Sequence, residues 1–286
     1  GTFSDGKLNT GTNDKRIPFV LKTFCECGAP KEILWRQKPH IGTDMLRVVV
    51  VNLRKKIISM GGEFHFNCRL DELCIKNNEL ESVIVSENGE KKEIPCKIAV
   101  LALGHSARDT FESLYKKGLK MIQKPFSVGA RIEHTQEFIN SSQYGKFANH
   151  PSLPVADYKL AVHLENGRGV YSFCMCPGGY VVNASSEEEM LCTNGMSNFK
   201  RDGKNANSAL LVSVNPNDFG SDYALSGMEF QRKIERAAYN LSGSYKLPAQ
   251  TVGAFLGEYT PISKVTPTVN VCECDLGSIL PQFVTN

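Results

Sequence analysis

The sequence has no apolar run long enough to cross a membrane and no strong excess of either charge. Its longest apolar runs, such as Val48–Val51 and Ile98–Leu103, are far shorter than the roughly 20 residues that a bilayer requires. The net charge of +3 does not indicate nucleic acid or a membrane surface as a partner. The first residues contain no apolar segment of the kind found in a signal peptide. We therefore predict a cytoplasmic protein with a small-molecule substrate, and the oligomeric state stays open.

Internal repeats and low-complexity tracts are also missing, and cysteines are too few for a disulfide scaffold. Apolar residues make up 41% and charged residues 22% of the 286, which is typical of an ordinary globular protein. The length fits two domains or one large domain. Most of the ten cysteines lie in apolar or strand-like settings, which favours reduced thiols.

Three Cys-x-Cys pairs are present. Because residues i and i+2 of a strand share a face, each pair could offer two thiolates to one metal ion. Structural zinc sites, however, usually space their cysteines by two to four residues, and no His-x-x-x-His partner is present. We therefore predict no metal site. The pairs are Cys25/Cys27, Cys174/Cys176 and Cys272/Cys274.

A helix followed by a series of short strands is predicted in the first third of the chain. Thr43 can cap the start of the helix, and Gly61-Gly62 ends it. Turn residues at Asn77-Asn78 and around Asn88-Gly89 then separate strand-like runs. The predicted strands are Glu63–Cys68, Leu70–Ile75, Leu80–Ser86 and Lys92–Cys96.

The run Ile98–Leu103 is predicted to be a fully buried strand of a parallel sheet. It leads directly into Gly104-His105-Ser106, and the helix-like stretch Asp109–Tyr115 follows. Glycine lets the backbone come close to a ligand, and ligands of open α/β sheets lie beyond the carboxyl ends of strands. Gly104, His105 and Ser106 are therefore candidate cofactor contacts; a plain strand-to-helix turn is the alternative.

From about Lys124 the pattern changes to short strands with many Gly, Asn and Pro turns. Phe126–Glu133 is predicted to be the first of them, and they continue to Val214. A helix is predicted after the capping box Ser226–Glu229. This pattern is typical of an α+β domain. The buried stripe of the helix would be Phe230, Ile234, Ala237 and Leu241.

Several longer motifs resemble those of the uncharacterised bacterial FAD-dependent dehydrogenases, distant relatives of the glutathione-reductase-like flavoproteins. The resemblance extends over essentially the whole chain. It implies an α/β plus α+β fold: a partial, Rossmann-like FAD-binding domain at 1–123 with an antiparallel meander at 63–97, an inserted mixed sheet-and-helix substrate domain at 124–260, and a return segment at 261–286. The motifs lie at 1–8, 38–44, 102–109, 131–134, 171–179, 194–198 and 205–208.

The sequence departs from this family in two respects that concern the cofactor. Members end in a Gly-rich segment that closes over the flavin, and this sequence stops before it. Members carry a Gly-x-Gly-x-x-Gly unit before the position of Gly1, and this sequence contains none. The pyrophosphate of FAD is normally held by backbone N–H groups at that helix N-terminus. We therefore predict an internal fragment of an FAD enzyme that by itself lacks FAD and activity.

The resemblance also implies roles for single residues. Ser4 and Lys7 lie in a loop that resembles loops approaching the flavin ring, where a lysine would stabilise the anionic reduced flavin. A solvated terminal turn is the alternative. In related flavoproteins the backbone at the position of Leu70 meets the adenine; an ordinary meander residue is the alternative.

The candidates for catalysis are His105, Cys174 and Cys176. A redox-active cysteine beside a flavin could relay electrons, but a single intervening residue strains the disulfide ring, which favours a structural turn facing the substrate. His105 and His134 could each act as acid or base near neutral pH, and His105 has the better position at the predicted strand end. The resemblance implies hydride transfer between an organic substrate and flavin; a non-enzymatic ligand-binding module is the alternative.

Overall fold

The computed structural model describes residues 2–258, 262 and 266–285. The protein is a mixed α/β structure whose larger sheets are antiparallel. It divides into two compact units, each of which is described by itself. Unit 1 comprises 1–55, 125–215 and 231–286, and unit 2 comprises 56–124 and 216–230.

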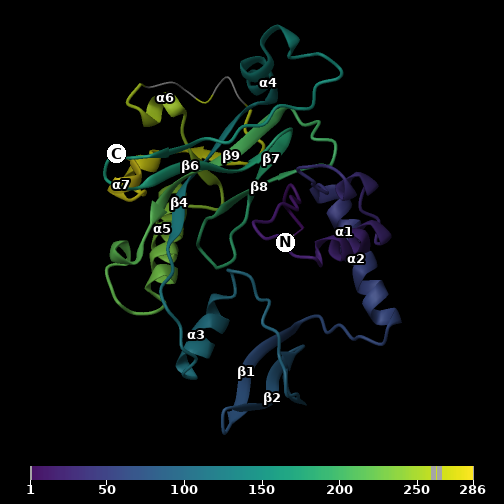
Figure 1. Cartoon of the computed structure of the whole chain (residues 1–286). Coiled ribbons are helices and arrows are strands. Elements are labelled where there is room, and N and C mark those ends of the chain that lie inside the picture. Colours follow the sequence, from purple (N-terminus) through teal and green to yellow (C-terminus); the bar gives the residue numbers. More distant parts are fainter. Residues whose placement is uncertain (1, 259–261, 263–265, 286) are drawn as a thin grey trace. The chain divides into compact units, whose positions relative to one another are not determined.

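The helices and strands follow one another along the chain as labelled in Figure 1. The α-helices are α1 (Ile17–Glu26), α2 (Thr43–Ser59), α3 (Arg108–Lys116), α4 (Gln136–Tyr144), α5 (Ser226–Ser242), α6 (Val252–Phe255) and α7 (Gln282–Thr285). Short 3-10 helices lie at η1 (Lys31–Leu34), η2 (Gly145–Phe147), η3 (Pro216–Phe219) and η4 (Leu276–Ser278). The strands are β1 (Cys68–Lys76), β2 (Glu79–Glu87), β3 (Glu90–Pro95), β4 (Phe126–Thr135), β5 (Ala161–His163), β6 (Gly169–Cys176), β7 (Gly179–Asn183), β8 (Thr193–Ser197), β9 (Asn205–Val214), β10 (Leu247–Ala249) and β11 (Val271–Glu273).

The main sheet of unit 1 has the strand order β4-β9-β6-β5. β4 and β9 pair along ten residues, from Phe126 opposite Val214 to Thr135 opposite Asn205. The hairpin β7–β8 continues from the end of β6, and β10 pairs with β11 in parallel. Helix α4 follows β4 directly, and Thr135 caps it by accepting a hydrogen bond from the Phe138 N–H. The predicted strand at 126–133 is therefore confirmed.

One hydrophobic core of unit 1 lies where α1, η1 and α2 meet. Cys27, Ile33, Ile41 and Val49 are almost fully buried there. Figure 1 shows α1 and α2 crossing next to the N-terminal loop. Gly61, with a φ of 89°, follows α2, and the Gly62 N–H bonds back to the Ile57 carbonyl. The predicted helix and its glycine stop are confirmed.

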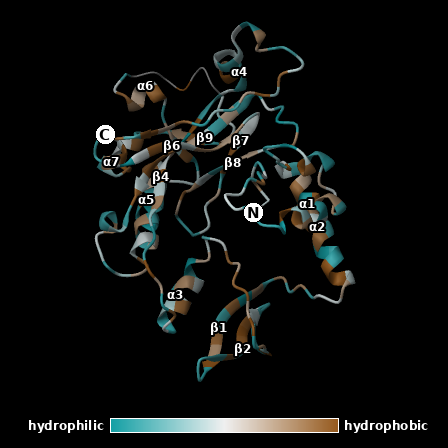
Figure 2. Ribbon diagram, viewed as in Figure 1, coloured by the Kyte–Doolittle hydropathy of each residue, from teal (hydrophilic) through white to brown (hydrophobic). Residues whose placement is uncertain are grey.

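Unit 2 contains an antiparallel meander, β1-β2-β3, as predicted. Asn77 and Asn78 both have positive φ, as do Asn88 and Gly89, which is the geometry of type I′ turns between twisted strands. Helix α3 packs on β1, and the Ser113 hydroxyl donates to the Asp71 carbonyl. Figure 2 shows hydrophobic residues along β1 and β2.

Two strands predicted in unit 2 are wrong. Residues 63–67 are irregular and exposed, because Cys68 already pairs with Glu87, the last residue of β2. The run Ile98–Leu103 is also irregular, and Ile98 and Val100 are 84% and 88% exposed. In the part of the chain that the structure describes, no strand flanks this run. Without neighbours on both sides an apolar run cannot form a buried parallel strand.

Helix α5 begins at Ser226 as predicted, although its first turn differs from a capping box. The Ser226 hydroxyl donates to the Ser221 carbonyl and accepts from the Gln123 side chain. The predicted stripe of α5 is half-buried, and its neighbour Ala238 is buried. The Rossmann-like character of the first domain and the domain boundaries remain predictions. No helix among the described residues is long and apolar enough to span a bilayer.

Candidate functional site

The N-terminal loop of unit 1 is held in place by a short antiparallel ladder. The Ile41 N–H donates to the Gly6 carbonyl, and the Gly42 N–H donates to the Asp5 carbonyl, both at 3.0 Å. The Leu8 N–H donates to the Pro39 carbonyl at 2.9 Å. This ladder fixes the backbone of residues 5–8, so their side chains have defined positions. The alternative of a solvated terminal turn is therefore wrong.

Asp5 is a fully buried carboxylate with several partners. The Arg201 guanidinium donates to both of its oxygens, at 3.1 and 2.5 Å, and the Ser197 hydroxyl donates to Oδ1. The Lys7 ammonium lies 3.2 Å from Oδ2. Burial alone would raise the pKa of Asp5, but the hydrogen bond from Arg201 and the charge of Lys7 outweigh burial and hold it below its ordinary value.

Lys7 connects this carboxylate to the end of β6. Its ammonium donates to the Met175 carbonyl at 2.5 Å and lies 4.0 Å from the Cys174 sulfur. The Lys7 side chain is 34% exposed, so the cation is held by protein groups on one side and reaches solvent on the other. A positive charge is therefore fixed beside a partly exposed thiol.

The two thiols of the second Cys-x-Cys pair lie on a β-bulge. Phe173 pairs with Ala209 and Cys176 pairs with Asn207, so β6 uses one more residue than β9 over this interval. Cys174 takes up the extra residue with a φ of 50°, a left-handed conformation that is uncommon outside glycine. The bulge re-aims the Cys174 side chain, and the Cys176 sulfur donates to the Cys174 carbonyl at 3.3 Å.

The Pro177-Gly178-Gly179 turn fixes this bulge against the segment that carries Arg201. A Cβ on Gly178 would lie only 1.8 Å from the Arg201 carbonyl oxygen, so only glycine fits. The Gly178 N–H donates to the buried Gln136 side chain, and its carbonyl accepts from the Gly203 N–H. The turn thus explains how thiols and Arg201, far apart in sequence, share one site.

The charges around Cys174 change the protonation of the pair. A hydrogen bond from Cys176, together with the positive charges of Lys7 and Arg131, lowers the pKa of Cys174 to about 6, against the opposing effects of burial and Asp5. The pKa of Cys176 is raised by the same hydrogen bond and by its burial. At neutral pH Cys174 is thus mainly the thiolate and Cys176 the thiol.

Arg131 and Asn207 form the wall of the site on β4 and β9. The Arg131 guanidinium donates to the Asn207 side-chain oxygen at 2.8 Å. Nε of Arg131 and Nδ2 of Asn207 are buried and have no hydrogen-bond partner among the described residues. Gly195 on β8 faces this pair, since a Cβ there would lie 2.2 Å from the Asn207 oxygen. These two N–H groups could therefore donate hydrogen bonds to an acceptor atom at the site.

The other two Cys-x-Cys pairs have different surroundings. Cys25 lies in the last turn of α1 and Cys27 is buried in the α1–α2 core, so the expectation that this pair shares the face of a strand is wrong. Cys272 and Cys274 do lie close together, with 3.1 Å between their sulfur atoms. Burial and the neighbouring Cys272, however, raise the pKa of Cys274 to about 11. In the part of the chain described, no three His, Cys, Asp or Glu side chains gather as a metal site.

The predicted site residues fall into two groups. Ser4, Lys7, Cys174 and Cys176 belong to unit 1, where Lys7 meets the thiol pair and Ser4 accepts a hydrogen bond from the Gly6 N–H. Leu70 lies on β1 of unit 2, opposite Val85. Gly104, His105 and Ser106 form an exposed turn before α3, also in unit 2. Their predicted roles toward FAD remain predictions.

His134 has a structural partner, and its role as a general acid or base remains a prediction. Its Nε2 lies 2.9 Å from the Tyr158 hydroxyl, and burial lowers its pKa. His40, another buried histidine, stacks on Phe199 and bonds its carbonyl. Both rings therefore have structural partners.

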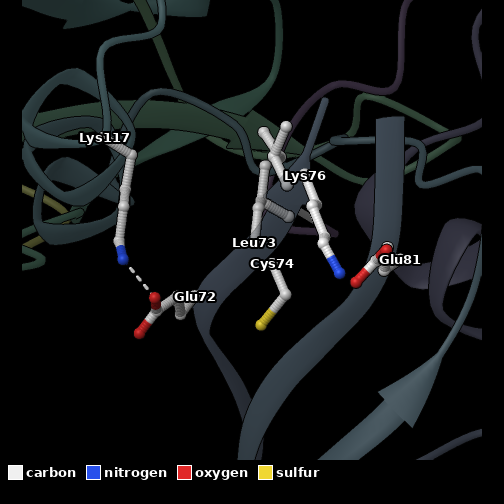
Figure 3. A pocket seen from close by; sticks show the side chains of 7 residues that line it. Glu72, Leu73, Cys74, Lys76, Glu81 and Lys117 are labelled. Carbon is white, nitrogen blue, oxygen red and sulfur yellow. Dashed lines mark hydrogen bonds and ion pairs between the residues drawn. The ribbon is translucent and has the colours of Figure 1, made fainter. Parts of the chain in front are cut away.

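Two shallow cavities are lined by residues other than those of the Asp5–Lys7–Cys174 cluster. One, of about 300 Å³, is in unit 2 beside β1 and β2, where Cys74 and the ion pair between Lys117 and Glu72 line it (Figure 3). The other, of about 320 Å³, is lined by residues of the N-terminal loop and η1, among them Leu8 and Trp35. None of the predicted site residues lines either cavity.

Reasoning from the sequence alone missed the charged and amide residues that complete the cluster. Asp5, Arg131, Arg201 and Asn207 were not singled out, although three of the four lie within motifs that carry the resemblance. The signal that could have found three of them is their position inside these motifs. In unit 1 the motifs meet around Asp5 and Cys174; they are those at 1–8, 38–44, 131–134, 171–179, 194–198 and 205–208.

Comparisons with known proteins give one relative and one matching family. An uncharacterised protein of Clostridium beijerinckii is 49% identical over 290 residues, a match that covers 99% of this chain and 54% of the relative. The chain thus spans about half the length of the relative that it matches. Residues 125–286, more than half of the chain, match the family described as FAD-dependent protein, C-terminal domain-like. The chain therefore belongs to this family of FAD-dependent proteins.

Proposed function

We propose that the protein to which this chain belongs is an FAD-dependent oxidoreductase that transfers hydride between an organic substrate and flavin. The observation that carries the proposal is the family match over residues 125–286. When bound, the flavin supplies the hydride chemistry, and the protein supplies binding, orientation and charge. The substrate class is left open by the residues described.

The start of helix α2 does not fit the diphosphate of FAD. Helix α2 starts after a glycine, as a diphosphate site requires, but Phe199 covers that start. A Cβ on Gly42 would lie 2.1 Å from the Phe199 nitrogen, and the Asp44 carboxylate already accepts the Phe199 N–H. The proposal therefore assigns the diphosphate to residues other than these.

The contribution of this chain is a fixed cation beside a thiolate. Asp5 and the Met175 carbonyl hold the Lys7 ammonium in one position while part of the side chain stays exposed. A charge that is already positioned needs no reorganisation when a negatively charged group arrives, which makes it effective in catalysis. This is the feature expected of a site that stabilises an anionic partner.

The test is to purify the protein over the full length of its relatives and to record its visible absorbance. We expect stoichiometric flavin that is bleached anaerobically by an organic reductant or a reduced nicotinamide and recovers with an acceptor. Flavin that is bound but cannot be reduced in this way would favour the non-enzymatic binding module. Protein that takes up no flavin would contradict the proposal.

A further inference from the structure

The Cys174–Cys176 pair differs from an ordinary pair of cysteines on a strand. In a regular strand the Cα atoms of residues i and i+2 are about 6.6 Å apart, at the upper limit for a disulfide. The bulge and the left-handed Cys174 interrupt the regular strand here, and the Cys176 sulfur lies 3.3 Å from the Cys174 carbonyl oxygen. The straight-strand geometry that disfavours a disulfide is therefore absent at this pair.

The two thiols also differ from each other in access. Cys174 is partly exposed, whereas Cys176 is fully buried. Lys7 approaches Cys174 within 4.0 Å, and Asn207, opposite Cys176 on β9, retains an unpartnered buried N–H group among the described residues. One thiol can therefore meet a substrate from solvent, while the other can meet only its neighbour.

Backbone strain supports a functional role for this arrangement. A non-glycine residue in the left-handed region costs of order 1 kcal/mol or more and persists where the surrounding structure holds it. Here Gln136, Pro177 and Gly178 hold the turn that follows the bulge. The strained backbone at Cys174 therefore holds its thiol in a partly exposed position.

We propose that Cys174 and Cys176 form a dithiol pair that reduces organic disulfides, with Cys174 as the attacking thiolate and Cys176 as the resolving thiol. The Cys174 sulfur attacks one sulfur of the substrate R–S–S–R′, the S–S bond breaks, and R′S⁻ leaves and takes up a proton from solvent. Cys176 then loses its proton and attacks the Cys174 sulfur, and RS⁻ leaves as RSH. Two protein thiols and one organic disulfide become one protein disulfide and two organic thiols.

The protonation of the pair fits this order of events. Thiol–disulfide exchange requires a thiolate, and Cys174 is the thiolate of the pair at neutral pH. The pKa of Cys176 is raised by its hydrogen bond to Cys174, by burial and by the negative charge of the Cys174 thiolate. The first and last of these effects end once Cys174 is in the mixed disulfide, so Cys176 becomes easier to ionise when its attack is due.

The first experiment follows alkylation of individual cysteines by iodoacetamide against pH, by mass spectrometry of the folded chain. Because thiols of lower pKa are also weaker nucleophiles, the pH midpoint is the informative quantity rather than the absolute rate. We expect a midpoint near pH 6 for Cys174, so that its rate falls only about twofold from pH 9 to pH 6. The rate of an ordinary thiol falls more than a hundredfold over that interval.

The Cys272–Cys274 pair of the same chain is the matched control. Its sulfur atoms lie 3.1 Å apart, but the pKa of Cys274 is raised to about 11. The groups that set the Cys174 midpoint are Cys176, Lys7, Arg131 and Asp5. Lys7→Met should raise the midpoint by about one pH unit, and Lys7→Arg should keep it low. A Cys174 midpoint of 8 or above would overturn the proposal.

The second experiment treats the reduced chain with glutathione disulfide. We expect the wild-type chain to lose the mass of two hydrogen atoms, because Cys174 and Cys176 form a disulfide. We expect the Cys176→Ser variant to accumulate a glutathione adduct on Cys174. Cys174→Ser should form neither product, and Cys272→Ser should behave like the wild type. An adduct on the wild type that never resolves, or equal reaction of Cys272, would contradict the proposal. No flavin is needed, so its outcome is independent of the proposed FAD chemistry.

Discussion

At the scale of single residues, the site depends on a buried carboxylate. Asp5 is fully buried, and its charge is matched by Arg201 and Lys7. A buried ion pair contributes little net stability compared with an apolar pair of the same shape, but removing one partner leaves an uncompensated charge. Asp5 therefore acts mainly by fixing the positions of the two cations.

Asp5→Asn should destabilise the chain by about 3 kcal/mol at neutral pH, because Arg201 loses its charged partner. The pKa of Asp5 is lower in the folded than in the unfolded chain. Its stabilising effect is therefore complete above the unfolded value of about 4 and is lost as the pH falls through the folded value. Urea unfolding of wild type and variant between pH 3 and 7 measures this: the difference should shrink below about pH 4.

The control for Asp5 is Asp14, which pairs with Arg16 at the surface. Asp14→Asn should change the stability of the chain much less than Asp5→Asn, since exposed ion pairs contribute little. If both variants lose the same stability, Asp5 has no special role.

The strain at Cys174 can be measured by comparing two substitutions. Cys174→Gly and Cys174→Ala both remove the thiol, but only glycine adopts a φ of 50° without cost. We expect the glycine variant to be more stable than the alanine variant by about 1 kcal/mol. Thermal unfolding at one pH gives the difference. Alanine as stable as glycine would show that the left-handed conformation stores no strain.

At the scale of elements, the site exists because glycines let three strands and a turn approach one another. Gly178 meets the Arg201 carbonyl, and Gly195 of β8 faces Arg131 and Asn207 of the main sheet. Side chains at these positions would separate the hairpin β7–β8 from β4 and β9. This close packing places the Arg131 guanidinium where its positive charge acts on the Cys174 thiol.

Gly195→Ala should displace Arg131, because the new Cβ would lie 2.2 Å from the Asn207 oxygen and 2.6 Å from an Arg131 nitrogen. We expect a loss of about 1–3 kcal/mol in stability and a higher alkylation midpoint for Cys174, since Arg131 helps to lower its pKa. Gly11→Ala is the matched control, as a Cβ there has no atom within 4 Å. A Gly195→Ala protein with an unchanged midpoint would remove Arg131 from the site.

At the scale of the whole molecule, the candidate residues belong to two units. The thiols and their cations lie in unit 1, whereas Leu70, Gly104, His105 and Ser106 lie in unit 2. The family match covers residues 125–286, and with them the thiol pair but not unit 2's turn at Gly104. A cofactor role for Gly104 therefore requires its own test.

Gly104→Val in the full-length protein should weaken FAD binding, if the turn contacts the cofactor. Gly104 has a φ of 69°, and a Cβ there has no atom within 4 Å, so backbone strain is the main folding cost. Gly118, with a φ of 85° and equally open space, provides the control Gly118→Val in the same unit. Titration of the two apo variants with FAD gives their affinities for the cofactor. Equal affinities of the Gly104→Val and Gly118→Val proteins would show that Gly104 belongs to a structural turn.

Local patterns predicted many of the elements correctly. Helix α2 with its glycine stop, the meander with its asparagine turns, and β4 follow from capping, turn chemistry and apolar periodicity, which act between residues close in sequence. The run Ile98–Leu103 shows the limit. Its apolar pattern is that of a buried strand, but burial depends on neighbours that the pattern cannot specify.

Residue types alone identify Lys7, Cys174 and Cys176 as chemically capable side chains, because they carry a positive charge and reactive sulfur. Their meeting in space follows from the fold, which residue types do not specify. On a straight strand, the Cys-x-Cys spacing predicts a strained disulfide ring. The bulge in β6 means that Cys174 and Cys176 do not lie on a straight strand. The three Cys-x-Cys pairs have the same spacing, yet the pKa of Cys174 is lowered, whereas the pKa values of Cys25 and Cys274 are raised. The hydrogen bond from Cys176 lowers the pKa of Cys174, and Lys7 and Arg131 add positive charge from segments far away in the chain. Electrostatic interactions act through space, and distances in space are set by the fold.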